Sequence, residues 1–208
     1  MKNLLLLLGL LFSFTQIQAT PDNLNSDASI DSIFTQNEIR DLEVLVGFFE
    51  KQISTKGTTE DLPSTYQAFF EKMAQTKKIG AIKLPLDFEE QQKIYQQIDP
   101  KTFDEIWLGS KAITHEGDTI NTIQLNREGK YKRLLEALST QNPTLLKYDY
   151  DLETAGDLSP AMVAHVIKKY PKYDISQPTV RLVLAIHYLT LNDRLKRNNG
   201  PLMRISSN

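Results

Sequence analysis

The 208-residue chain contains no cysteine, three histidines and one tryptophan. Without cysteine it can form neither disulfides nor a thiolate nucleophile, which excludes the small disulfide-stabilised secreted domains and the cysteine-dependent enzymes. The formal net charge is only −2, from 24 basic and 26 acidic residues. This near balance gives no reason to expect nucleic acid or an anionic membrane surface as a partner.

Several short catalytic motifs are also missing from the sequence. It has no Gly-x-Ser-x-Gly, Ser-x-x-Lys or His-Glu-x-x-His motif, no glycine-rich phosphate-binding loop and no dinucleotide-binding fingerprint. We therefore expect no cofactor and lean against an enzyme. Paired carboxylates for glycoside hydrolysis stay open, because such residues are often far apart in the sequence.

The longest apolar run lies at the amino terminus, where Lys2 precedes the segment Leu4–Phe14 and Ala19 offers a small residue at the expected cleavage position. This pattern is typical of a secretory signal peptide over residues 1–19, cleaved after about Ala19, with an apolar run too short to span a bilayer. No cysteine follows, so a lipoprotein is not expected. The sequence thus predicts a bacterial periplasmic or secreted protein without a transmembrane segment after signal cleavage.

Most of the remaining chain has the apolar spacing of helices. We expect a flexible amino-terminal segment over 20–33, a single α-helical domain over 34–198 and a tail over 199–208. Helix starts are marked by capping residues or prolines, and the helices are expected from Thr35, Leu62, Asp87, Asp99, Glu128, Asn142, Ser159 and Ser176. The fourth of them is expected to include Trp107 and to end at Gly109.

The segment Ser176–Arg197 is apolar on almost every side when it is drawn as a helix. Such a helix belongs in the middle of a bundle, in contact with several others. The predicted fold is therefore mainly α, a compact multi-helix bundle around a buried carboxy-terminal helix.

Residues 110–126 interrupt the helical pattern with β-branched residues and a central Glu116-Gly117 turn signal. They predict a small β-hairpin at about 111–125, and the alternative is a long irregular loop. At its turn, His115, Glu116 and Asp118 could bind a divalent metal or act as an acid–base pair. The alternative is an ordinary solvated turn, because turns attract polar residues without any further role.

Two other groups of residues could contribute to a site. His165 and His187 lie on successive predicted helices and could share a zinc ion with one more ligand, or they could be two separate core or boundary histidines. Trp107, next to the irregular segment, could be a platform for a sugar or a peptide, although large aromatic side chains are usually buried.

These observations favour an exported α-helical binding protein of the bacterial cell envelope, with a protein, peptide or glycan as its partner and its contact surface near Trp107 and residues 110–126. One alternative is an envelope hydrolase or lyase that uses His115, Glu116 or Asp118. A second is a structural protein that forms oligomers.

Overall fold

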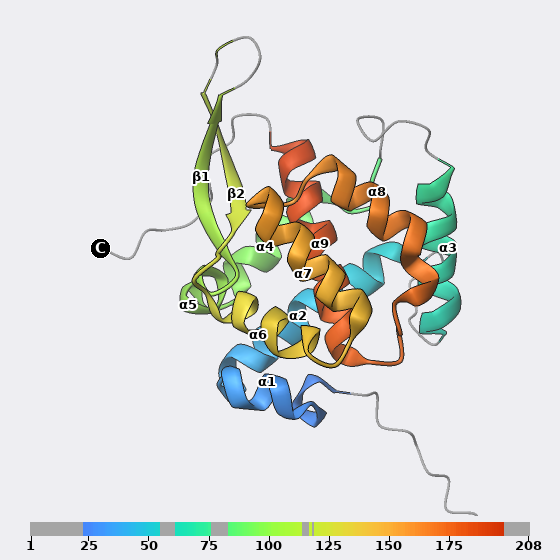
Figure 1. The fold of residues 1–208 in the computed structure, drawn as a ribbon. Helices are drawn as coiled ribbons and strands as arrows, with labels where there is room; N and C mark the ends of the chain where they lie inside the picture. Colours follow the sequence, from blue (N-terminus) through green and yellow to red (C-terminus); the bar gives the residue numbers. More distant parts are fainter. Residues whose placement is uncertain (1–22, 55–60, 76–82, 114–116, 118, 198–208) are drawn as a thin grey trace, which may run out of the picture.

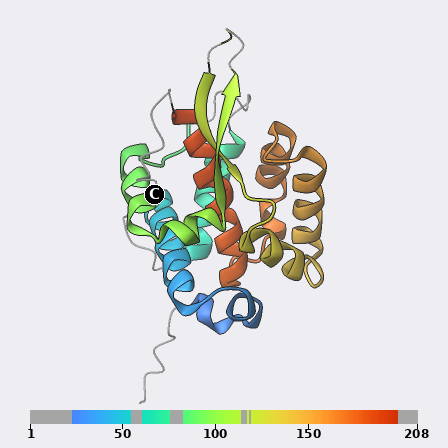
Figure 2. The ribbon, with the colours of Figure 1, turned by 90° about the vertical axis from the view of Figure 1, so that its left-hand side faces the viewer.

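Helix α9 (Pro178–Lys196) runs through the middle of the molecule, with other helices on several sides of it (Figures 1 and 2). The computed structural model describes residues 23–54, 61–75, 83–113, 117 and 119–197. Within these ranges the other helices are α1 (Ala28–Ile33), α2 (Gln36–Ile53), α3 (Leu62–Ala74), α4 (Phe88–Gln97), α5 (Pro100–Asp104), α6 (Lys130–Ser139), α7 (Pro143–Ala155) and α8 (Pro160–Lys169), with 3-10 turns at Leu24–Ser26 and Tyr170–Lys172. The predicted mainly-α fold is confirmed.

Every residue of α9 from Thr179 to Asp193 is buried, as its apolar pattern predicts. The helix begins after Gln177, one residue later than expected, and Pro178 occupies the first turn, where its missing N–H costs no hydrogen bond. No helix in the described part of the chain is long and apolar enough to cross a membrane.

Aromatic rings from two other helices pack against the middle of α9. Phe49 of α2 lies parallel to Tyr188 with 5.8 Å between the ring centroids, and Phe69 of α3 meets Tyr188 edge to face at 4.8 Å. Phe49 and Phe69 also touch each other edge to face, which joins α2 to α3. Edge-to-face and offset contacts of this kind add to the stabilisation from burial alone.

A buried polar network joins the carboxy-terminal end of α9 to α4. The Arg197 guanidinium donates two hydrogen bonds to the Asp193 carboxylate and one to Gln92, at 2.9 Å. Asn192 donates to Gln91, which in turn donates to the Leu189 carbonyl. Because buried polar groups must be paired, this network fixes the position of α4 along α9.

The strands β1 (Trp107–Ile113) and β2 (Thr119–Leu125) form an antiparallel hairpin, in which Trp107 pairs with Leu125 and Ile113 with Thr119. The predicted hairpin is therefore present, but it begins earlier than expected. The expectation that a helix extends to Trp107 is wrong, because α5 ends at Asp104 and Trp107 is the first residue of β1. Figure 1 shows the far part of the hairpin extending beyond the helices.

The segment 20–33, expected to be flexible, contains short helices in its described part. Asn23 and Asp27 cap two short helical segments with their side chains, and Leu24 and Ile30 are buried in the core. Helix α1 packs against α6, which lies far away in the sequence. This packing places the amino-terminal end of α1 beside the candidate site.

Candidate functional site

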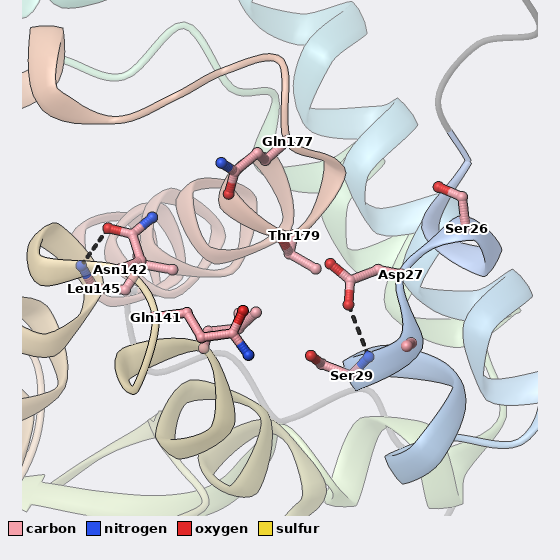
Figure 3. A pocket seen from close by; sticks show the side chains of 10 residues that line it. Ser26, Asp27, Ser29, Gln141, Asn142, Leu145, Gln177 and Thr179 are labelled. Carbon is pink, nitrogen blue, oxygen red and sulfur yellow. Dashed lines mark hydrogen bonds between the residues drawn. The ribbon is translucent and has the colours of Figure 1, made fainter.

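A pocket of about 450 Å³ opens where the start of α1, the α6–α7 corner and the start of α9 meet (Figure 3). Most of its lining is polar, from Ser26, Asp27, Ser29, Gln141, Asn142, Gln177 and Thr179. Ala28, Leu138 and Leu145 complete it with apolar surface. Small-molecule sites in proteins typically have volumes of about 300–1,000 Å³.

Helix capping explains why polar residues gather at this point. The Asp27 Oδ1 atom accepts a hydrogen bond from the Ser29 N–H at 2.8 Å at the start of α1. The Asn142 Oδ1 atom accepts from the Leu145 N–H at 3.2 Å at the start of α7. Residues with short polar side chains are preferred at such positions. The same residues that begin the helices therefore also supply polar atoms to the pocket.

Gln177, at the start of α9, behaves differently from these two caps. Its side chain makes no capping hydrogen bond and donates instead to the Asp174 carboxylate at 2.9 Å. In the first turn of α9, Pro178 has no N–H, and the Val180 and Arg181 N–H groups donate to the Gln177 carbonyl. Among the described residues the Thr179 N–H has no partner, and it can donate to an oxygen atom of a ligand.

Several polar groups of the lining have unused hydrogen-bonding capacity. The second carboxylate oxygen of Asp27 turns away from Ser29 and toward Thr179, and Gln141 extends toward Ser29 from the opposite wall (Figure 3). Among the described residues, neither this oxygen nor the side-chain amide of Gln141 has a hydrogen-bond partner. Thr179, only 1 % exposed, contributes to the lining from α9.

Among the described residues that line the pocket, Asp27 is the one ionisable residue. Asp174 lies just behind Gln177, and hydrogen bonds, above all from the Ser176 side chain, lower the pKa of its carboxyl group. Both carboxylates add negative charge, and among the described lining residues no lysine, arginine or histidine offsets it. This part of the lining therefore suits a neutral or cationic ligand, and its described residues include no pair of titratable groups for acid–base catalysis.

The structure places Trp107, the proposed platform, inside the core. The side chain is fully buried, and its indole N–H donates a hydrogen bond of 2.7 Å to the Thr190 hydroxyl. The rings of Tyr95 and Phe103 lie against it, each with a centroid distance of 5.0 Å. This is the position of a structural tryptophan, and the indole is closed to a ligand at the surface.

The two helical histidines lie in different surroundings. His187 is fully buried, and its Nδ1 atom lies 3.2 Å from the Tyr148 hydroxyl. Burial, and then the nearby Arg194, lower the pKa of His187 to about 3, so the ring is neutral at neutral pH. His165 lies on α8 and is partly exposed. Within the described ranges, no three or more His, Asp or Glu side chains are grouped to hold a metal ion.

The third predicted group, His115, Glu116 and Asp118, lies outside the described residues. Between them, Gly117 has a φ of 92°, a left-handed conformation that favours glycine and suits the turn predicted there. A metal-binding or acid–base role of these three side chains stays a prediction.

The pocket itself was missed by sequence reasoning. Its residues come from three distant segments, and the two visible signals, Asn142-Pro143 and Ser176-Gln177-Pro178, were interpreted only as helix starts. No local pattern shows that these starts face one another.

Comparisons of this chain with protein-family models, with curated proteins and with solved structures found no match.

Proposed function

We propose that this chain is an exported binding protein of the bacterial cell envelope, whose ligand occupies the pocket between α1, the α6–α7 corner and α9. The observation that carries this proposal is the lining, whose described residues place unused polar groups around about 450 Å³ and include no pair of acid–base residues. Concave sites of this size with a few convergent polar groups are the usual binding sites of small ligands.

Export is proposed from the amino-terminal residues 1–19, with their basic, apolar and small-residue regions in the order of a signal peptide. The absence of cysteine suits a protein that reaches its stability in an oxidising compartment without disulfides. The pocket replaces the surface near Trp107 as the proposed contact region, because that indole is buried.

The pocket favours a small ligand or the end of a larger one, such as a peptide terminus or a short glycan. A folded protein partner would need a contact surface of about 800 Å² on each side, far larger than this opening can supply. The half-buried Leu138 would contact aliphatic groups, while the side-chain amides and hydroxyls would pair with polar ones.

The proposal is tested with the isotopically labelled chain over residues 20–208, titrated with trialanine, a glucosamine trimer and their N-acetylated forms. We expect at least one compound to shift the amide resonances of Ser29, Gln141 and Thr179. The variant Ala28→Trp places a large ring in the pocket from an exposed helix position, and we expect it to weaken this binding at least tenfold.

Ser32→Trp is the matched control, because Ser32 is exposed on the same helix and does not line the pocket. It should leave the affinity unchanged. If none of the compounds binds, or if Ala28→Trp and Ser32→Trp affect binding equally, the pocket is not the functional site.

A further inference from the structure

The charge distribution of the pocket indicates one chemical class of ligand. We infer that the ligand carries a protonated primary amino group that pairs with the Asp27 carboxylate, and this inference rests on the proposed function. The amino group is the amino terminus of a short peptide. An amino sugar offers the same ammonium chemistry, and the experiment separates these two sources.

Asp27 is held in place for such a contact. Its Oδ1 atom is fixed by the hydrogen bond from the Ser29 backbone N–H, so the orientation of the carboxylate does not depend on a ligand. The other oxygen then faces the pocket, toward Thr179 (Figure 3). Asp27 is half-buried, which limits competition from water for this oxygen. A pre-oriented carboxylate loses little conformational entropy when an ammonium group binds.

Among the described residues that line the pocket, no cationic side chain competes for Asp27. The ion pairs of the described residues engage other carboxylates. Behind the lining, Asp174 accepts a hydrogen bond from Gln177, and Arg181 donates to the Ile175 and Ser176 carbonyls of the same segment. Within this lining, an anionic ligand would therefore meet the Asp27 carboxylate and no positive side chain. A cationic group provides the charge that the pocket lacks.

The rest of the lining favours a peptide over a sugar. The Gln141 side-chain amide can donate to and accept from peptide groups, and the Asn142 amide can donate, because its oxygen already accepts from the Thr144 and Leu145 N–H groups. In the first turn of α9, the Thr179 N–H is left to donate to a peptide carbonyl. The half-buried Leu138 provides a surface for an aliphatic side chain. Among the described residues that line the pocket none is aromatic, so a sugar ring would lack the flat surface on which it could stack.

The test uses the substitution Asp27→Asn with the same four compounds. Asparagine caps a helix as well as aspartate does, so the variant removes the charge and keeps the start of α1. We expect the wild-type chain to bind trialanine at least tenfold more tightly than N-acetyl-trialanine, and Asp27→Asn to abolish this difference. The matched control is Asp87→Asn, which changes the same residue type at the start of α4, outside the pocket. It should leave both affinities unchanged.

Two results would overturn the inference without affecting the proposed function. Equal binding of free and acetylated trialanine, or unchanged discrimination by Asp27→Asn, would exclude the ammonium contact even if Ala28→Trp still blocked the pocket. Preference for the glucosamine trimer over trialanine, lost in Asp27→Asn, would keep the ammonium contact and overturn the assignment to a peptide. If no compound binds, the inference and the pocket proposal both fail.

Discussion

At the scale of single residues, the polar side chains buried along α9 distinguish this core from a purely apolar one. Arg181 lies 3.1 Å from the Glu50 carboxylate, and Tyr66 donates a hydrogen bond of 3.2 Å to the same group. Burial raises the pKa of Glu50, while Arg181 acts in the opposite direction. Removing one partner of such a pair costs about 3–5 kcal/mol, because the other is left buried and unpaired.

His187 leads to a prediction about pH. The pKa of His187 is about 3 in the folded chain, against 6.5 for an ordinary histidine. Between these values the unfolded chain binds a proton that the folded chain does not. The free energy of unfolding should therefore decrease as the pH falls below 6.5, by up to about 1.4 kcal/mol per pH unit from this residue.

The measurement is urea unfolding at several pH values from 7 to 4, on the wild type and on His187→Gln. Subtracting the two curves removes the contributions of other titrating groups, such as Glu50. We expect the wild type to lose stability relative to the variant throughout this range. If the two plots of unfolding free energy against pH were parallel, His187 would also bind a proton in the folded chain, and the prediction would be wrong.

At the scale of helices and strands, elements with local signals were predicted well. The Thr35 capping box begins α2, and Asn142-Pro143 and Ser159-Pro160 begin α7 and α8 where expected. The prediction that Trp107 is helical was wrong because its strand forms by pairing with Leu125, and the spacing of apolar residues does not reveal this pairing. The α1 segment was missed for a similar reason, since its polar composition gives no sign that Ile30 reaches the core.

Replacing glycine by alanine should change the free energy of unfolding in opposite directions at two positions. A Cβ atom on Gly129, before α6, would lie 2.3 Å from the Glu105 carbonyl oxygen, so backbone must shift. We expect Gly129→Ala to lower the free energy of unfolding by about 1–3 kcal/mol. Gly47, exposed within α2, has open space around it, and Gly47→Ala should raise the free energy of unfolding by about 0.5–1 kcal/mol.

Urea unfolding at neutral pH measures both variants against the wild type. Each serves as the control for the other, because the added methyl group is the same. Destabilisation by both, or by neither, would contradict the difference in packing between the two sites.

At the scale of the whole molecule, the central position of α9 followed from its composition, whereas the pocket did not follow from any part of the sequence. A helix that is apolar on all sides is most favourably placed in the interior of a fold, in contact with several other elements. A pocket instead depends on how helix starts converge, and Asp27, Gln141 and Gln177 are brought together by packing between distant segments. The three candidate sites predicted from residue chemistry, at the 115–118 turn, at His165 and His187, and at Trp107, therefore do not include this pocket.

The proposed export gives a prediction for the intact chain. Expressed in a Gram-negative bacterium, the protein should be recovered from the periplasm or the medium, with a mass corresponding to a start at Thr20. The double variant Leu6→Arg, Leu8→Arg interrupts the apolar run and should remain in the cytoplasm at full length. Gln16→Asn, a control outside that run, should be processed normally. Full-length wild-type protein in the cytoplasm would contradict export.

Helix α9 follows its packing partners in the chain, and this order has a consequence for biosynthesis. Partners such as α2 leave the ribosome long before α9 does, and they cannot bury their apolar faces until α9 is available. A nascent chain should therefore stay loosely organised until α9 has been synthesised. The export proposed above requires a chain that has not yet folded, and the order of the helices would supply such a delay.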